Sequence, residues 1–278
     1  MNITEKTVIP LEILVATMNR SSLDFLDDMF KNVDISECHI LIVNQTTHQV
    51  LLKSLKQNIR IINSFEKGLS KSRNLALQNA KGEIVLISDD DVIFEYDFLN
   101  IILKAFHKKP DAALITFIAK NFEGMLYRNY QSYSHLHTLS SIKCVISWEI
   151  AFRLENIQRL NIIFDENFGL GGQFTTAEEY LFVRDVLIHG KTCWFENAAI
   201  VSHPVFNSGQ EAESDRIIYA RAALHYKFYK QLAYLWLIKY LFFLVRHKYI
   251  QISDFKHKWS LGIKGIKDYQ VLLNKLAT

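Results

Sequence analysis

Three consecutive carboxylates, Asp89 to Asp91, follow an apolar run from Ile84 to Ile87. The run is too short to form a helix of its own, so we interpret it as a buried, parallel strand. In open α/β sheets, ligands bind at the carboxyl ends of such strands. Adjacent carboxylates repel each other, and a divalent cation that prefers oxygen ligands, Mn²⁺ or Mg²⁺, would relieve the repulsion. Taken alone, the three residues are equally compatible with a solvated acidic turn.

A glycine loop and a short helix precede this strand. Gly68, Ser70 and the first turn of the helix offer backbone N–H groups, and Arg73 offers a fork-shaped side-chain donor. We expect Ser70 to cap the helix, and the apolar residues that should face a core are Leu75, Leu77 and Ala80. Donors suited to an anion, placed beside a candidate cation site, indicate that the segment binds a metal-bound diphosphate.

A second group of candidate residues lies between residues 147 and 184. A glycine-rich stretch from Phe164 to Gly172 precedes two glutamates, Glu178 and Glu179, at an expected helix start. A carboxylate at such a helix start could act as a general base that takes a proton from a bound hydroxyl. The glycines would form a mobile flap over a bound ligand. The alternative is that both glutamates merely complement the helix dipole.

Together, the two groups resemble the family 2 glycosyltransferases of GT-A fold. The resemblance rests on Gly-Leu-Ser-x-x-Arg-Asn-x-Ala from Gly68, on the strand that ends in three aspartates, and on Phe-Asp-Glu-x-Phe-Gly-x-Gly from Phe164. It covers roughly residues 10–205. It implies an α/β fold of GT-A type, in which a Rossmann-like, mixed and mostly parallel sheet is flanked by helices. It also implies inverting transfer of a sugar from a nucleotide-diphosphate donor to a hydroxyl of a glycan or lipid-linked acceptor, as in surface polysaccharide synthesis.

The resemblance assigns roles to individual side chains. Glu179 matches the catalytic base, although the family usually has Glu-Asp where this chain has Glu178-Glu179. Asp91 matches a ligand of Mn²⁺ or Mg²⁺, and His203 matches a further ligand. The alternative for His203 is a loop histidine without a ligand. The expected nucleotide-sugar contacts are Thr17, Asn19, Arg20, Asn44, Gln45, Ser70, Arg73, Asp89 and Asp90, and the expected acceptor-side residues are Trp148, Gly171 and Glu178.

Two features leave details of the donor site open. The second strand ends in Asn44-Gln45, where the family usually has acidic residues, so a donor of UDP or GDP type is expected without a choice between them. Amides both donate and accept, which suits a base or ribose contact, but ordinary turn chemistry is the alternative. With three aspartates in a row, either Asp89 or Asp90 would contact ribose and diphosphate.

Apolar patterns predict the alternating strands and helices that are typical of a doubly wound sheet. Residues 120–142 are expected to form a long loop that borders the acceptor cleft. A catalytic domain is expected over residues 1–210, with a nucleotide-sugar-binding half at 10–120 and an acceptor half at 121–210. The expected strands cover residues 11–16, 39–43, 59–62, 84–87, 112–119 and 191–201, and the expected helices cover residues 22–31, 48–56, 70–80 and 96–106.

The C-terminal region, residues 211–278, differs in character and is expected to be helical. Eleven Lys or Arg and only two Asp fall in residues 221–278, although the whole chain has a net charge of only +3. The apolar run 232–245 is interrupted by Lys239 and is shorter than the roughly 20 residues of a membrane span. This favours an interfacial amphipathic helix on anionic lipid. The alternative is a helix packed against the catalytic domain or against a second copy in a homo-oligomer.

The composition, 49% apolar and 22% charged over 278 residues, is that of a globular protein. The three cysteines form no Cys-x-x-Cys pair, so neither a disulfide framework nor a zinc knuckle is indicated. The N-terminus lacks an apolar signal core. We therefore expect a cytoplasmic protein that contacts the inner face of the cell membrane peripherally. No recognised nucleic-acid module accompanies the basic charge, so nucleic acid is not expected as a partner.

Two other functions are compatible with parts of the sequence. A nucleotidyltransferase on a similar sheet would need a Lys/Arg-rich glycine loop near the N-terminus, but residues 17–22 contain only one arginine. A catalytically silent partner, which binds glycan or assists another transferase, would not need the three aspartates, Glu179 and His203 intact. The sequence therefore favours the transferase over both alternatives.

Overall fold

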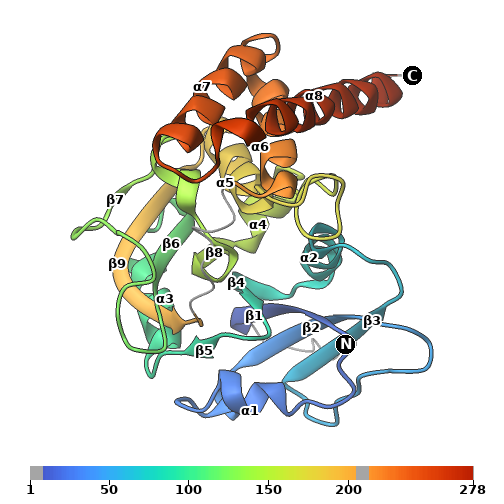
Figure 1. The fold of residues 1–278 in the computed structure, drawn as a ribbon. Helices are drawn as coiled ribbons and strands as arrows, with labels where there is room; N and C mark the ends of the chain where they lie inside the picture. Colours follow the sequence, from blue (N-terminus) through green and yellow to red (C-terminus); the bar gives the residue numbers. More distant parts are fainter. Residues whose placement is uncertain (1–8, 205–212, 278) are drawn as a thin grey trace. The chain divides into compact units, whose positions relative to one another are not determined.

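The computed structural model describes residues 9–204 and 213–277 (Figure 1). Its contacts divide the chain into two compact units, one made of residues 1–165 and 179–205 and the other of residues 166–178 and 206–278. The expected boundary near residue 210 therefore describes only part of the division. The glycine-rich segment 166–178, which we placed in the acceptor half, groups with the C-terminal helices instead.

A mixed sheet forms the centre of the first unit. Its strand order is β3-β2-β1-β4-β8-β6-β9-β5, and β7 pairs with β9 beside this path. Neighbours among β1 to β4 are parallel, as expected, and β8 is antiparallel to both β4 and β6. The strands are β1 (Ile9–Met18), β2 (His39–Gln45), β3 (Ile59–Ser64), β4 (Gly82–Asp89), β5 (Ile93–Phe94), β6 (Ala112–Lys120), β7 (His135–Leu136), β8 (Ile150–Arg153) and β9 (Thr192–Ser202).

Helices cover both faces of this sheet. Side chains alternate along β1, so that Ile13 and Val15 join one buried cluster and Leu14 joins the other. The first cluster includes apolar residues of α1 and α3, and the second includes residues of α2, α4 and α5. The helices of this unit are α1 (Phe25–Met29), α2 (Leu69–Asn79), α3 (Phe98–Lys108), α4 (Leu154–Arg159) and α5 (Glu178–Ile188), with 3-10 turns η1 (Ile35–Glu37), η2 (Ser141–Cys144) and η3 (Ser147–Glu149).

Two local predictions are wrong. Residues 48–56 form no helix, because the buried Leu52 is held by the side-chain amide of Asn63. That amide accepts from the Leu52 N–H and donates to the Leu52 carbonyl, both at 2.9 Å, much as a strand neighbour would. Ser70 does not cap α2. The N-cap is Gly68, whose φ of 132° lies in a region that residues with a side chain rarely adopt. Ser70 lies buried in the first turn of the helix.

Three helices dominate the second unit (Figure 1). They are α6 (Asp215–Tyr229), α7 (Leu232–Arg246) and α8 (Phe255–Ala277), with the 3-10 turn η5 (Ile252–Asp254) between the last two. Gly265 lets α8 approach α6 closely, because a Cβ there would lie 2.2 Å from the Tyr219 carbonyl oxygen. Within segment 166–178, Phe168 and Phe174 are fully buried and both contact the ring of Tyr269. None of the helices in the described residues is long and apolar enough to cross a membrane.

Candidate active site

The carboxyl end of β4 brings the three aspartates to three different sets of partners. Asp89, the last residue of the strand, accepts hydrogen bonds on both of its oxygens. Arg73 of α2 donates to Oδ1 at 3.1 Å, and the hydroxyl of Ser147 in η3 donates to Oδ2, also at 3.1 Å. Asp89 therefore faces two residues that flank the strand rather than the solvent alone.

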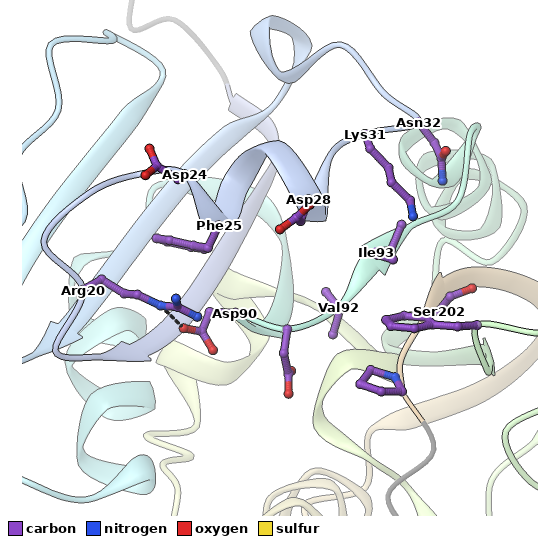
Figure 2. Close-up of a pocket in the computed structure, with 13 residues that line it drawn as sticks. Arg20, Asp24, Phe25, Asp28, Lys31, Asn32, Asp90, Val92, Ile93 and Ser202 are labelled. Atoms are coloured by element: carbon purple, nitrogen blue, oxygen red, sulfur yellow. Dashed lines mark hydrogen bonds and ion pairs between the residues drawn. The ribbon is translucent and has the colours of Figure 1, made fainter.

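Asp90, in the turn after β4, bonds the end of β1 and the loop that follows it. The hydroxyl of Thr17 donates to its Oδ2 at 2.5 Å, and Arg20 Nε donates to the same oxygen at 2.7 Å, as Figure 2 shows for Arg20. The Arg20 guanidinium also lies over the ring of Phe25, 5.0 Å from its centroid. These contacts join the first strand to the fourth through side chains that sequence analysis had grouped as nucleotide-sugar contacts.

Asp91 faces His203, which follows β9. Its Oδ1 lies 3.2 Å from His203 Nε2, while His203 Nδ1 lies 2.7 Å from the carbonyl oxygen of Pro204. That carbonyl can only accept, so Nδ1 must carry a proton. Nε2 therefore faces the Asp91 carboxylate, and a metal ion is one group that could lie between the two.

The residues around this pair fit a divalent cation in part. Neighbouring ligands of an octahedral ion, each about 2.1 Å from it, lie about 3 Å apart, which matches the 3.2 Å between Asp91 Oδ1 and His203 Nε2. The proton on Nδ1 is held by a backbone carbonyl, as is usual for metal-binding histidines. No group of three or more His, Cys, Asp or Glu side chains in the described residues is arranged to hold a metal ion.

Two aromatic side chains hold His203 in place. The indole of Trp148 stacks on the imidazole with ring centroids 4.0 Å apart and planes 7° apart. The Tyr127 ring meets His203 edge-on at 5.7 Å and Trp148 edge-on at 5.9 Å. A hydrogen bond from His203 holds the pKa of Asp91 below its usual value, although burial acts in the opposite direction. Trp148, expected on the acceptor side, thus lies against the candidate metal ligand.

Arg73 connects the two halves of the sequence. Its Nη1 lies 3.3 Å from Oε1 of Glu179, the second residue of α5, while its other terminal nitrogen bonds Asp89. The guanidinium is only 3% exposed and lies over the ring of Phe164, 5.5 Å from its centroid. The expected helix start at Glu178 is confirmed, and Glu178 itself is buried. Arg73 therefore contacts carboxylates, whereas we had expected it to face a diphosphate.

The amides at the end of β2 are engaged with the chain itself. Asn44 is fully buried and bonds both the N–H and the carbonyl of Arg20, at 3.1 and 2.9 Å. Gln45 is 5% exposed, and its Oε1 accepts from the N–H of Gly68 at 2.7 Å. These side chains hold the loops before α1 and α2 in position. Asn19, by contrast, is exposed in the left-handed conformation with φ of 55°.

A pocket of about 820 Å³ opens beside these residues (Figure 2). It is bordered by Asp90 and Asp91, by Arg20 and by residues of α1, β5 and the end of β9. A volume of this size suits a ligand such as a nucleotide sugar. Sequence reasoning missed Ser147 and Tyr127. Neither carries a motif of its own, and each reaches the site through contacts between distant segments, Ser147 with Asp89 and Tyr127 with Trp148 and His203.

Comparisons with known proteins agree with this geometry. None of the curated proteins compared with the chain matches it. Among solved structures, S. aureus TarS 1-349 superposes with a TM-score of 0.55 at 17% identity, covering 93% of this chain and 81% of that one. The same TarS fragment in complex with UDP-GlcNAc gives 0.54 at 18% identity, with 94% and 80% covered. The longer TarS structure gives 0.56, and this chain covers 48% of it.

These superpositions, all at low identity, show a shared fold. The sequence itself matches the model of "Glycosyl transferase family 2" over residues 12–181, which is more than half of its length. The match includes the three aspartates, Arg73 and Glu179, and it ends just inside α5. The chain belongs to glycosyl transferase family 2.

Proposed function

We propose that this glycosyltransferase moves a sugar from a nucleotide-diphosphate donor to an acceptor hydroxyl with inversion of configuration. The observation that carries the proposal is the bridge made by Arg73. It joins Asp89 at the end of β4 to Glu179 at the start of α5, although Arg73 and Glu179 are 106 residues apart in sequence. The proposed proton acceptor and the carboxylate-rich strand end therefore lie close to each other, which supports an inverting transfer.

The donor is proposed to be of UDP type. TarS, the structural neighbour, has been solved with UDP and with UDP-GlcNAc. In this chain, the diphosphate and ribose would lie near Asp90, Arg20 and the pocket that these residues border. Asp91 and His203 would hold Mn²⁺ or Mg²⁺, which when bound supplies positive charge to the leaving diphosphate.

Glu179 is the proposed general base. It takes the proton of the acceptor hydroxyl while the oxygen attacks the anomeric carbon, and the bond to the diphosphate breaks with its electron pair leaving on the phosphate oxygen. Attack comes from the face opposite the diphosphate, so the configuration inverts. Arg73, fixed by Asp89 on its other side, holds the Glu179 carboxylate in position for this step.

Two conservative substitutions test these assignments. We expect Asp91→Asn and Glu179→Gln each to abolish sugar transfer from UDP-sugars and to leave the circular dichroism spectrum unchanged. Matched controls are the exposed Asp111→Asn and Glu155→Gln, which should retain full activity. Transfer retained by Asp91→Asn or Glu179→Gln would remove that residue from its role.

A binding measurement separates this function from its rivals. Titration calorimetry with UDP and GDP, with and without Mn²⁺, should show Mn²⁺-dependent binding of UDP. Absence of binding to either nucleotide would favour a catalytically silent partner of another transferase. A donor panel screened for Mn²⁺-dependent hydrolysis then identifies the sugar.

The acceptor is proposed to be a glycan or lipid-linked precursor at the inner face of the cell membrane, in surface polysaccharide synthesis. The supporting feature is α7, a mostly apolar helix that buries only one stripe of its surface. No acidic residue occurs from residue 231 to residue 253, so the surface complements an anionic membrane. Its exposed large apolar residues, with exposed fractions in parentheses, are Leu232 (65%), Leu235 (51%), Ile238 (37%), Phe242 (57%) and Phe243 (47%).

Vesicle flotation tests this membrane contact. The chain should float with vesicles that contain anionic phospholipid and remain unbound with neutral ones. Leu235→Ser and Phe242→Ser should each weaken binding about tenfold, whereas Val271→Ser on α8, which is 54% exposed, should have no effect. Equal binding of all variants would refute the contact. A dimer seen by light scattering and lost in Phe242→Ser would assign the surface to a second copy.

A further inference from the structure

Glu149 is a fully buried carboxylate that the proposed reaction does not use. It ends η3, a three-residue turn whose first two residues both contact the candidate site. Ser147 donates to Asp89, and Trp148 stacks on His203. The turn therefore places the Ser147 side chain against Asp89 of β4 and the Trp148 side chain against His203. The position of η3 fixes the position of both of these side chains.

Glu149 is held by two residues from the long segment 120–142. Arg128 donates to its two oxygens, with Nη2 at 2.6 Å from Oε2 and Nε at 3.4 Å from Oε1. The hydroxyl of Tyr130 donates to Oε1. The Arg128 guanidinium also lies over the Tyr130 ring, 4.2 Å from its centroid. We name these three residues the Glu149 cluster.

The Glu149 cluster is itself tied to the sheet. The Tyr130 oxygen accepts from the N–H of Ala119 in β6 at 3.1 Å, and its ring stacks on Phe195 of β9 with planes 6° apart. The backbone N–H of Glu149 bonds the carbonyl of Ile146. Burial raises the pKa of Glu149, and Arg128 acts in the opposite direction. A buried carboxylate with this many partners fixes one orientation, because every other orientation would leave charges unpaired.

We propose that Glu149 is a positioning residue for the transferase site, which it orients through Ser147 and Trp148. The inference rests on the proposed function, because it assigns Asp89 and His203 to donor and metal binding. It also gives the segment 120–142 a definite role. Tyr127 of this segment packs on Trp148 and His203, while Arg128 and Tyr130 bond Glu149. The segment therefore contacts two of the three residues of η3.

Tyr130→Phe is the main test, because it removes one hydroxyl from the Glu149 cluster without changing the packed ring. Glu149→Gln removes the charge and is the second variant. The matched control is Thr116→Val. Thr116 makes another buried hydrogen bond to the same segment, at 2.7 Å between its hydroxyl and His137 Nε2, and this bond does not involve η3.

The readout is the position of the His203 ring protons in aromatic NMR spectra of protein labelled at histidine, assigned with His203→Gln. These protons lie against the face of Trp148, so ring current shifts them away from the values of exposed histidines. We expect Tyr130→Phe and Glu149→Gln to move them toward those values and Thr116→Val to leave them in place. In assays, kcat should fall about tenfold or more with a smaller change in the donor KM.

Unmoved His203 resonances in Tyr130→Phe would overturn the inference, even if that variant were less stable. Equal displacement in Thr116→Val would do the same, because it would show a general loosening of the segment. A wild-type chain without transferase activity would refute the proposed function instead, and the NMR comparison would still decide the role of Glu149.

Discussion

The bridge made by Arg73 gives a prediction that can be worked out quantitatively. The guanidinium is 3% exposed, and the side chains of its two partners, Asp89 and Glu179, are 23% and 18% exposed. Removing one partner of a buried ion pair costs about 3–5 kcal/mol, mostly because the remaining charges are left unpaired. Since both carboxylates retain some contact with water, we expect Arg73→Met to lower the free energy of unfolding by about 3 kcal/mol. This corresponds to a Tm lower by about 6–12 °C.

A double-mutant cycle separates this explanation from simple loss of packing against Phe164. If unpaired carboxylates cause the loss, then Glu179→Gln should partly restore the stability of Arg73→Met. The double variant should then be more stable than the sum of the single effects by about 1 kcal/mol or more. Effects that add to within about 0.5 kcal/mol would refute the reasoning, because they would show that Arg73 and Glu179 do not interact.

The assay for the cycle is urea unfolding followed by tryptophan fluorescence. The chain has four tryptophans, of which Trp148 and Trp194 lie in the first unit and Trp236 and Trp259 in the second. Replacing the latter two with phenylalanine leaves reporters only in the unit that holds Arg73. Conversion of the midpoints to free energies then applies to that unit alone.

Two further predictions concern the surroundings of the site and the second unit. Burial lowers the pKa of His137 to about 4, so the unfolded chain binds one more proton than the folded chain between pH 6.5 and pH 4. As the pH falls over this range, the free energy of unfolding should therefore decrease by about 2–3 kcal/mol more in the wild type than in His137→Gln. Equal pH profiles of the two proteins in urea unfolding would contradict this. Gly265→Ala would place a Cβ 2.2 Å from the Tyr219 carbonyl oxygen, so it should destabilise the second unit by about 1–3 kcal/mol. Thermal unfolding measures this effect against Lys267→Ala, an exposed position on the same helix. Equal Tm values for the two variants would contradict the close approach of α8 to α6.

Apolar runs and turn chemistry were enough to predict much of the first unit. The expected strands at residues 11–16, 39–43, 84–87 and 112–119 all lie inside observed strands, because runs this apolar are stable only when both faces are buried. Pattern reasoning failed where a polar side chain, rather than a neighbouring strand, bonds the backbone of a segment. Nothing in residues 48–56 predicts that the Asn63 amide will bond the backbone of Leu52.

The same limit applies to the candidate site. The family resemblance predicted roles for Asp91, His203 and Glu179, and residue type predicted one for Arg73, but the partners of these residues depend on contacts between distant segments. The 3.1 Å and 3.3 Å contacts of Arg73 join residues 16 and 106 positions away, which no local pattern encodes. The short antiparallel strand β8, which we did not predict, is placed between β4 and β6 and delivers η3 to the site.

The separation of the three aspartates has a consequence for comparing sequences. Asp89 bonds Arg73 and Ser147, Asp90 bonds Thr17 at the end of β1 and Arg20 after it, and Asp91 faces His203. A relative that carries only two aspartates at this point can be aligned in three ways with the same score. Each alignment would predict a different missing partner. The alignment should therefore be chosen from the partner residues rather than from the placement of the gap. An arginine after the first strand indicates that the equivalent of Asp90 is present, and a histidine after the last strand indicates that the equivalent of Asp91 is present.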